Sequence, residues 1–391
     1  MIPPRDAKTM TSEVIARMPP TRVSMPPTEG RCLVTEIEQM RRRDFVEVVT
    51  GVLAGGALAG CVSRRTGGGE TQSVAAAREA MREPMNAAAF HAARRYAGTR
   101  FGRIAYVERG TGDAALFLHG FPLNSFQWRG ALDLLSAHRR CVAPDFMAMG
   151  YTEVAKGQSV APDAQVAMLV ALLDTLSIPT VDLVANDSGG AVAQLFVTRH
   201  PERVRTLLLT NCDAENDSPP PALLPVIEMS KAGTFVDQWL ARWLADKALG
   251  RSAEGIGGMC YADPAHPTDE AIECYFAPLV SSPQRKALVH AYAIALERNP
   301  LEGIEPALKR CTVPTRIVWG TGDTIFSPAS PDYLDRTFGN SRGVLRLAGR
   351  KLFWPEELPD IVAEEARRLW GITQVPTVPT RAQSDRSIRG A

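Results

Sequence analysis

A polar segment of the chain, residues 186–190, reads Asn-Asp-Ser-Gly-Gly and separates an apolar strand-like run from an apolar helix-like run. A carboxylate at such a turn can attack carbon as a nucleophile, and its ester is then opened by water. A turn that holds a nucleophile requires small residues two positions before and after it, because the bend is strained. Counted from Asp187 these residues are Ala and Gly, whereas Ser188 would place the bulkier Asn on one side. The spacing favours Asp187 as nucleophile. The alternatives are Ser188, or an Asp187 that only caps the following helix.

Strands and helices alternate around this turn, which indicates how the nucleophile is positioned. Such alternation predicts an α/β fold with a mostly parallel sheet and helices on both faces. Reactive groups in these folds collect beyond the carboxyl ends of the strands. The predicted strands are 104–108, 114–118, 141–143, 181–185, 204–209, 315–319 and 344–347, and the predicted helices are 128–137, 162–176, 191–200 and 329–338.

The stretch 214–299 breaks the alternation and has a helical pattern throughout. Because the strand pattern resumes after it, we expect a helical cap inserted into one core rather than a separate domain. The core is then formed by two parts, 91–213 and 300–373. The cap helices are expected at about 235–249, 269–275 and 284–297.

A second motif, His-Gly-Phe-Pro at 119–122, follows the predicted strand 114–118. Together with the aspartate turn it resembles the α/β-hydrolase fold family, and the aspartate is similar to the haloalkane dehalogenase and epoxide hydrolase branches. The resemblance covers residues 101 to about 372. It implies an oxyanion hole made by the backbone N–H groups of Phe121 and Ser188, which would stabilise the tetrahedral oxyanion of an Asp187 ester.

The resemblance also implies an acid that orients a histidine. Asp323 ends the sequence Trp-Gly-Thr-Gly-Asp after the strand before the last, which is the place of that acid. Asp213, just after the strand 204–209, is the alternative acid, because some dehalogenase-like enzymes carry theirs there.

The histidine expected after the last strand is missing. Leu352 occupies its place, and none of the six histidines lies after Asp323. Alkylation of a carboxylate requires no base, but hydrolysis of the ester requires one to deprotonate water. Three explanations stay open. Lys351 can serve if burial lowers its pKa, a cap histidine (His290 or His266) can serve, or the protein has lost the hydrolytic step.

Three functions fit this scaffold. The first is hydrolysis of a small apolar epoxide or halide through an alkyl ester on Asp187. The second, motivated by the missing histidine, is non-hydrolytic binding or sensing, and the third is cofactor-free lyase chemistry with Asp187 as general base. Ser188 replaces the tryptophan with which haloalkane dehalogenases bind halide, so the motifs suit an epoxide hydrolase better. Three cap tyrosines are candidates to protonate an opened epoxide: Tyr261, Tyr275 and Tyr292.

Composition argues against other classes of function. The 391 residues carry a formal net charge of +1, so no basic field for nucleic acid is present. No run reaches the roughly 18 apolar residues of a membrane-spanning helix. The seven cysteines form no C-x-x-C pair and no G-x-G-x-x-G follows the first strand, so neither a metal nor an organic cofactor is expected. The oligomeric state stays open.

The chain begins with a region that resembles a targeting signal. Arg42-Arg43 opens a twin-arginine pattern, and the apolar run 48–60 ends in Leu-Ala-Gly before Cys61. Residues 40–61 resemble a bacterial lipoprotein signal of the twin-arginine (Tat) type. This implies export to the periplasm or cell surface and a membrane anchor through a lipid on Cys61. A short buried helix is the alternative.

The flanking segments have compositions without a regular period. Residues 1–39 are expected to be a gene-model extension or disordered. Residues 62–90, with Gly-Gly-Gly and many Ala and Ser, are expected to form a flexible linker, and residues 374–391 a disordered tail.

Overall fold

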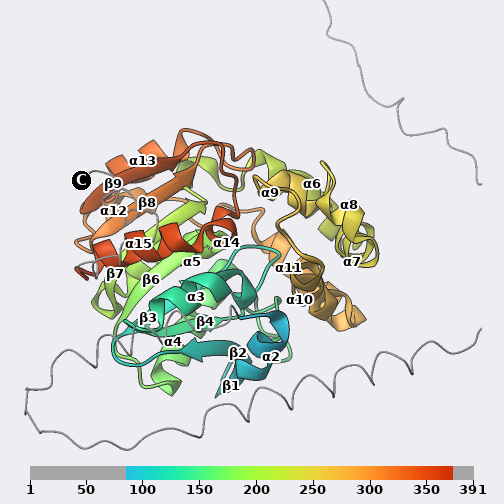
Figure 1. Cartoon of the computed structure of the whole chain (residues 1–391), viewed down its shortest axis with the longest axis horizontal. Coiled ribbons are helices and arrows are strands. Elements are labelled where there is room, and N and C mark those ends of the chain that lie inside the picture. The colour runs from blue at the N-terminus through green and yellow to red at the C-terminus, as the bar shows by residue number, and fades with distance from the viewer. Residues whose placement is uncertain (1–84, 373–391) are drawn as a thin grey trace, which may run out of the picture. The chain divides into compact units, whose positions relative to one another are not determined.

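The computed structural model describes residues 85–372 (Figure 1). The predicted extension 1–39, the signal 40–61, the tail 374–391 and most of the linker lie outside the described residues.

A nine-stranded sheet in the order β1-β2-β4-β3-β6-β7-β8-β9, with β5 beside β2, forms the centre of the core. All neighbouring pairs from β4 to β9 are parallel, and the pairs that involve β1, β2 and β5 are antiparallel. The seven predicted strands are confirmed; β1 and β5 were not predicted. The strands are β1 (Arg94–Thr99), β2 (Gly102–Arg109), β3 (Ala114–Leu118), β4 (Arg140–Pro144), β5 (Glu153–Val154), β6 (Val181–Asp187), β7 (Val204–Cys212), β8 (Thr315–Gly320) and β9 (Ser341–Leu347).

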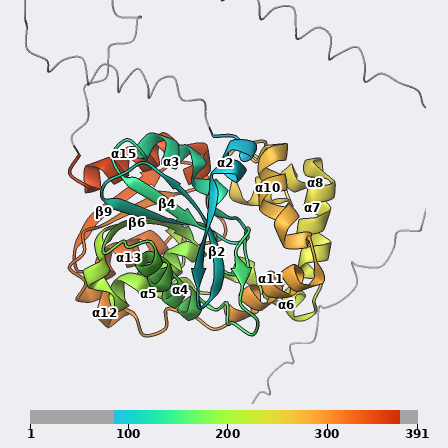
Figure 2. The ribbon, with the colours of Figure 1, turned by 90° about the horizontal axis from the view of Figure 1, so that it is seen from below.

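Helices cover both faces of this sheet, as the alternating pattern predicted (Figure 2). Figure 2 shows α3 and α15 on one face, and α4, α5, α12 and α13 on the other. The central strands β3 and β6 are buried along their whole length, which accounts for their continuous apolar runs. The helices are α3 (Arg129–Leu135), α4 (Pro162–Thr175), α5 (Ser188–Arg199), α12 (Glu305–Lys309), α13 (Ser330–Thr337) and α15 (Pro359–Leu369).

The cap is a group of short helices between β7 and β8, to one side of the sheet in Figure 1. The helix predicted at 235–249 is divided into a π-helical turn (Val236–Leu240), α7 and α8. Asp246 interrupts it, because its backbone is extended and its side chain caps α8 by accepting from Leu249 N–H. The cap helices are α6 (Leu224–Lys231), α7 (Ala241–Ala245), α8 (Lys247–Arg251), α9 (Ile256–Cys260), α10 (Asp269–Val280) and α11 (Pro283–Ala295).

The folded part begins before the predicted end of the linker at residue 90. Helix α2 (Ala87–Ala93) starts inside that segment, with Asn86 as its N-cap. Phe90 is fully buried and packs edge-on against Phe126, with 5.2 Å between ring centroids. The linker prediction is therefore wrong for residues 85–90, where one aromatic side chain in an Ala-rich stretch attaches the helix to the core.

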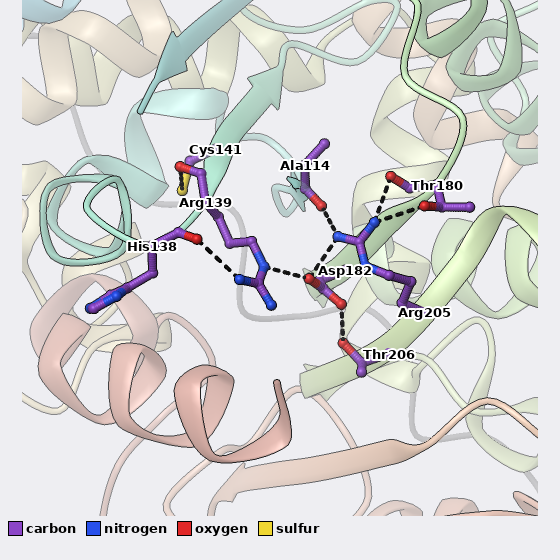
Figure 3. Close-up of polar contacts among 8 residues, drawn as sticks. All are labelled: Ala114, His138, Arg139, Cys141, Thr180, Asp182, Arg205 and Thr206. Carbon is purple, nitrogen blue, oxygen red and sulfur yellow. Dashed lines mark hydrogen bonds and ion pairs between the residues drawn. The ribbon is translucent and has the colours of Figure 1, made fainter. Parts of the chain in front are cut away.

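A buried ion cluster lies at the start of β6, at the opposite end of the strand from Asp187 (Figure 3). The side chain of Asp182 is 2% exposed, and its Oδ2 accepts from Arg139 Nε and Arg205 Nη2, both at 2.8 Å. Its Oδ1 accepts from Thr206 Oγ1 at 2.9 Å. The cluster joins β6 and β7 to the loop before β4.

Asp182→Ala is expected to lower the free energy of unfolding by about 3 kcal/mol, because two guanidinium groups would lose their buried counter-charge. Urea unfolding followed by circular dichroism measures this change. Asp163→Ala is the control, since it removes only an exposed ion pair with Arg199 and should cost less than about 1 kcal/mol. Equal losses in the two variants would show that the buried cluster stabilises the fold no more than an exposed ion pair does.

Candidate active site

Asp187 lies at the sharp turn between β6 and α5. Its backbone has φ 54° and ψ −135°, a conformation that L-residues rarely adopt. The turn closes against the loop after β3, since a Cβ on Gly189 would lie 2.6 Å from His119 O. The Asp187 side chain makes no capping hydrogen bond to α5. The arrangement therefore fits a nucleophile turn and not a helix cap.

The predicted oxyanion hole lies at this carboxylate. Asp187 Oδ2 accepts from Phe121 N–H at 2.7 Å, and the backbone N–H of Ser188 lies near enough to lower the pKa of the carboxylate. Gly120 permits the approach, because a Cβ there would lie 2.7 Å from the same oxygen. His119 helps to fix the loop after β3, because its Nε2 accepts a hydrogen bond from Phe146 N–H. Two backbone donors thus face an atom that would carry negative charge in a tetrahedral intermediate.

Burial raises the pKa of Asp187 well above its ordinary value, and the neighbouring Asp213 and Asp323 raise it further. The N–H donors of Phe121 and Ser188 lower this pKa, but not enough to offset burial. The ionised form that alkylation requires is therefore less favoured here than in an exposed carboxylate.

A cavity of about 130 Å³ opens in front of Asp187, between the core and the cap. A cavity of roughly 150 Å³ accommodates benzene, so this one suits a small molecule. The polar lining groups, within the part of the chain described, are Asp187, Ser188, Asp213 and Cys260. The remaining lining is mainly apolar, about a third of it aromatic, and includes Phe121, Phe235, Trp239, Trp243, Phe326 and Leu352.

The two candidate acids occupy different surroundings. Asp323 does not line the cavity, and its oxygens accept from Asn211 Nδ2 and Ile325 N–H, both at 2.8 Å. Asp213 does line the cavity, and its Oδ1 accepts from Ser218 Oγ at 2.8 Å. Burial raises the pKa of Asp213 to about 6. Asp323 is thus held in the manner of an orienting acid, but Asp213 is the one that faces the substrate space.

The structure brings none of the three candidate bases into the cavity beside Asp187. Lys351 Nζ donates to Gly258 O in the cap at 2.5 Å, and His290 Nε2 accepts from Val236 N–H at 3.2 Å. Neither residue lines the cavity. His266 stacks on Tyr261, with 5.6 Å between ring centroids. Leu352 does line the cavity and is 3% exposed, so an apolar side chain faces Asp187 from the loop after β9.

Buried amides behind the nucleophile were missed by the sequence analysis. Gln127 Nε2 donates to Asn186 Oδ1 at 2.6 Å, and Asn186 Nδ2 donates to the carbonyls of Asn211 and Leu352. Asn211 Oδ1 accepts from Gly320 N–H and Trp354 Nε1. These amides connect the nucleophile turn, the acid and the Leu352 loop. The sequence did contain a signal for them, because Asn186 and Asn211 are polar residues near the ends of two apolar strands.

The cap tyrosines do not act as a group. Tyr261 Oη donates to Glu356 Oε2 at 2.6 Å, beside the Arg129–Glu356 ion pair. Tyr292 stacks on Phe121 with 5.4 Å between centroids, and its hydroxyl lies near that of Ser188. Both hydroxyls are buried, and neither bonds to any other group of the described chain. Tyr292 is therefore the cap tyrosine whose hydroxyl lies beside the Asp187 turn.

No group of three or more His, Cys, Asp or Glu residues within 85–372 is arranged to hold a metal ion. No helix in the same range is long and apolar enough to cross a bilayer.

Residues 114–357 match the model of the alpha/beta hydrolase fold family. Haloalkane dehalogenase 2 of Mycobacterium tuberculosis is 26% identical over 280 residues, which is 67% of this chain and 89% of that protein. The 2-hydroxy-6-oxo-2,4-heptadienoate hydrolase of Pseudomonas putida is 38% identical over 103 residues, but this match spans only 26% of the chain and 37% of the relative. A solved epoxide hydrolase superposes with a TM-score of 0.59 at 21% identity, covering 71% of this chain and 98% of its own.

Proposed function

Because the chain belongs to the α/β hydrolase fold family, and the relatives similar to it include hydrolases, we propose that it acts on a small apolar epoxide or halide through an alkyl ester on Asp187. One observation carries the proposal. The Asp187 carboxylate, bound at Oδ2 by Phe121 N–H, lies at the wall of a mostly apolar cavity of about 130 Å³. Similarity to a haloalkane dehalogenase and an epoxide hydrolase supports both substrate classes.

In the proposed reaction, Asp187 Oδ1 attacks an sp³ carbon while Oδ2 stays in the oxyanion hole. The bond from that carbon to halide or epoxide oxygen breaks as the ester bond forms. The apolar walls favour a substrate without charge, and they exclude water that would otherwise solvate the carboxylate. The raised pKa of Asp187 follows from the same apolar surroundings.

The hydroxyl of Tyr292 favours the epoxide class. Opening an epoxide leaves an alkoxide on the substrate, which requires a proton donor, whereas halide leaves as a stable anion. Tyr292 Oη is buried beside the hydroxyl of Ser188, which lines the cavity although Tyr292 itself does not, so a donor is available directly behind the cavity wall. Trp239 and Trp243 also line the cavity, and their indole N–H groups are the donors that a halide would use.

Adduct formation tests the proposed function. We expect 1,2-epoxybutane, and more weakly 1-bromobutane, to add one alkyl group to the protein, detected by intact mass after acid quenching. Peptide mapping should place the group on Asp187. An activated ester such as p-nitrophenyl butyrate is the control, since an acyl group on Ser188 would identify serine as the nucleophile. Absence of any adduct on Asp187 with both alkyl probes, without turnover, would refute the proposal.

The signal-like segment 40–61 supports a location for this activity. Export by the twin-arginine route and a lipid on Cys61 would hold the hydrolase at a membrane surface outside the cytoplasm. Fractionation of cells that express the full chain tests this, because Cys61→Ser should move the protein from the membrane fraction to the soluble fraction. Equal partition of the two proteins would exclude the anchor.

A further inference from the structure

An ester on Asp187 turns over only if a group in the cavity removes a proton from water, and Leu352 occupies the place of the usual histidine. We propose that Asp213 is the general base that activates this water. The inference rests on the proposed function, because it concerns the second half of the same reaction. It gives Asp213 a direct role, in place of the role of an acid that orients a histidine.

The sheet places Asp213 beside the nucleophile. Strands β6 and β7 are parallel neighbours, and Asp187 is in register with Cys212. Adjacent strands lie about 4.8 Å apart, so the residue after Cys212 starts close to Asp187. Gln194 of α5 fixes its backbone by donating from Nε2 to Asp213 O at 2.8 Å. Both carboxylates line the same cavity.

One of the two oxygens of the Asp213 carboxylate can still accept a hydrogen bond from water. Oδ1 accepts from Ser218 Oγ, whereas Oδ2 accepts no hydrogen bond from the side chain or backbone of another described residue. In Asp323, by contrast, both oxygens are engaged by Asn211 and Ile325. Burial holds the pKa of Asp213 at about 6, which suits a base that must accept a proton near neutral pH and release it again.

The other titratable groups of the cavity are unsuited to this step. Asp187 is itself esterified when water attacks. Burial raises the pKa of the Cys260 thiol well above its ordinary value, so it would stay protonated. Lys351 and His290, the other candidates, bind Gly258 O and Val236 N–H respectively.

The step balances with water as the co-reactant. Water oxygen bonds to Cγ of the Asp187 ester while one water proton passes to Asp213, and the oxyanion accepts from Phe121 and Ser188 N–H. The bond from Cγ to Oδ1, the oxygen that carries the alkyl group, then breaks, and Asp213 returns its proton to this leaving alkoxide. The product therefore leaves with the former Oδ1, and the water oxygen stays on Asp187. Asp187 is left as a carboxylic acid and loses its proton to solvent. The product is an alcohol from a halide and a diol from an epoxide.

The test compares Asp213→Asn with wild type, using 1,2-epoxybutane and the full chain. We expect the variant to form the Asp187 adduct but to hydrolyse it about 100-fold more slowly or worse, so that the alkylated mass accumulates. Asp163→Asn is the control. Asp163 is an exposed carboxylate that pairs with Arg199 and lies outside the cavity lining. It should keep wild-type turnover, and Asp213→Glu should recover part of it.

Each outcome decides a separate point. Wild-type turnover in Asp213→Asn would overturn the role of Asp213 and leave Asp187 as nucleophile. A wild-type protein that stays alkylated would overturn it also, since no base would then be working. If neither protein forms an adduct, the proposed function fails, and the inference fails with it. Circular dichroism of each variant shows whether the fold is retained, and adduct formation by Asp213→Asn is itself evidence of a folded site.

Discussion

Replacement of Asp187 by asparagine is expected to abolish alkylation and turnover, by about 10⁴-fold or more, while stabilising the fold. The amide has the shape of the carboxylate, but it is a poor nucleophile at carbon. It still accepts from Phe121 N–H through its oxygen, so the turn is retained. Intact mass with 1,2-epoxybutane measures the first effect, and thermal unfolding measures the second.

The gain in stability should depend on pH in a defined direction. Burial raises the pKa of Asp187 in the folded state above its value in the unfolded chain. Between these two values the folded state holds a proton that the unfolded state releases, so stability falls as pH rises. The loss begins above about pH 4 and is complete above the raised folded-state pKa. The amide of the variant does not titrate, so the advantage of Asp187→Asn should widen across this interval.

The rate of alkylation should also depend on pH, because it too follows the ionisation of Asp187. Only the ionised carboxylate attacks, so single-turnover alkylation by 1-bromobutane should become faster as pH rises toward the raised pKa of Asp187. Asp163→Asn, an exposed carboxylate paired with Arg199, is the control for both measurements and should resemble wild type. A variant Asp187→Asn that is less stable than wild type at every pH would show that the carboxylate contributes favourable contacts that the structure does not account for.

Local patterns were enough to predict the turn and the layers around it. The glycines after Asp187 can be recognised from one short segment of the sequence, because the strained bend requires small residues there. The buried strands β3 and β6 are continuous apolar runs. Strand β1 escaped prediction because it lies at the edge of the sheet and is partly exposed, so its sequence, Arg-Arg-Tyr-Ala-Gly-Thr, lacks an apolar pattern.

The electrostatics of the site could not be predicted in this way, because they depend on segments that are distant in the sequence. Asp187 meets Phe121, Asp213 and Leu352 only after the sheet and cap assemble, and their joint burial sets the raised pKa. Asn211 was overlooked because its role as the partner of Asp323 spans more than a hundred residues. Lys351 was a candidate through its position next to Leu352, but its side chain donates to Gly258 O in the cap, whereas Leu352 lines the cavity.

Leu352→His is expected to raise turnover by about 100-fold or more, provided that alkylation is not the slower step. Leu352 lines the cavity with Asp187, and its backbone oxygen is fixed by Asn186 Nδ2, so an imidazole there would start from a held position. Asp323 is already bound by Asn211 and Ile325, and a carboxylate can accept further hydrogen bonds. The fold therefore contains Asp323, the acid that would orient a histidine, although Leu352 stands in place of that histidine.

A second variant connects this prediction to the role of Asp213. If Asp213 acts as the base in the natural chain, an introduced histidine should make it dispensable. Leu352→His combined with Asp213→Asn should then hydrolyse the Asp187 ester, whereas Asp213→Asn alone stays alkylated. Leu352→Gln is the matched control, because it is polar but does not titrate near neutral pH. Rescue by glutamine as well as histidine would mean that admitting water, and not accepting its proton, limits the reaction. Failure of histidine to rescue, with the fold intact, would place the defect of Asp213→Asn outside proton transfer.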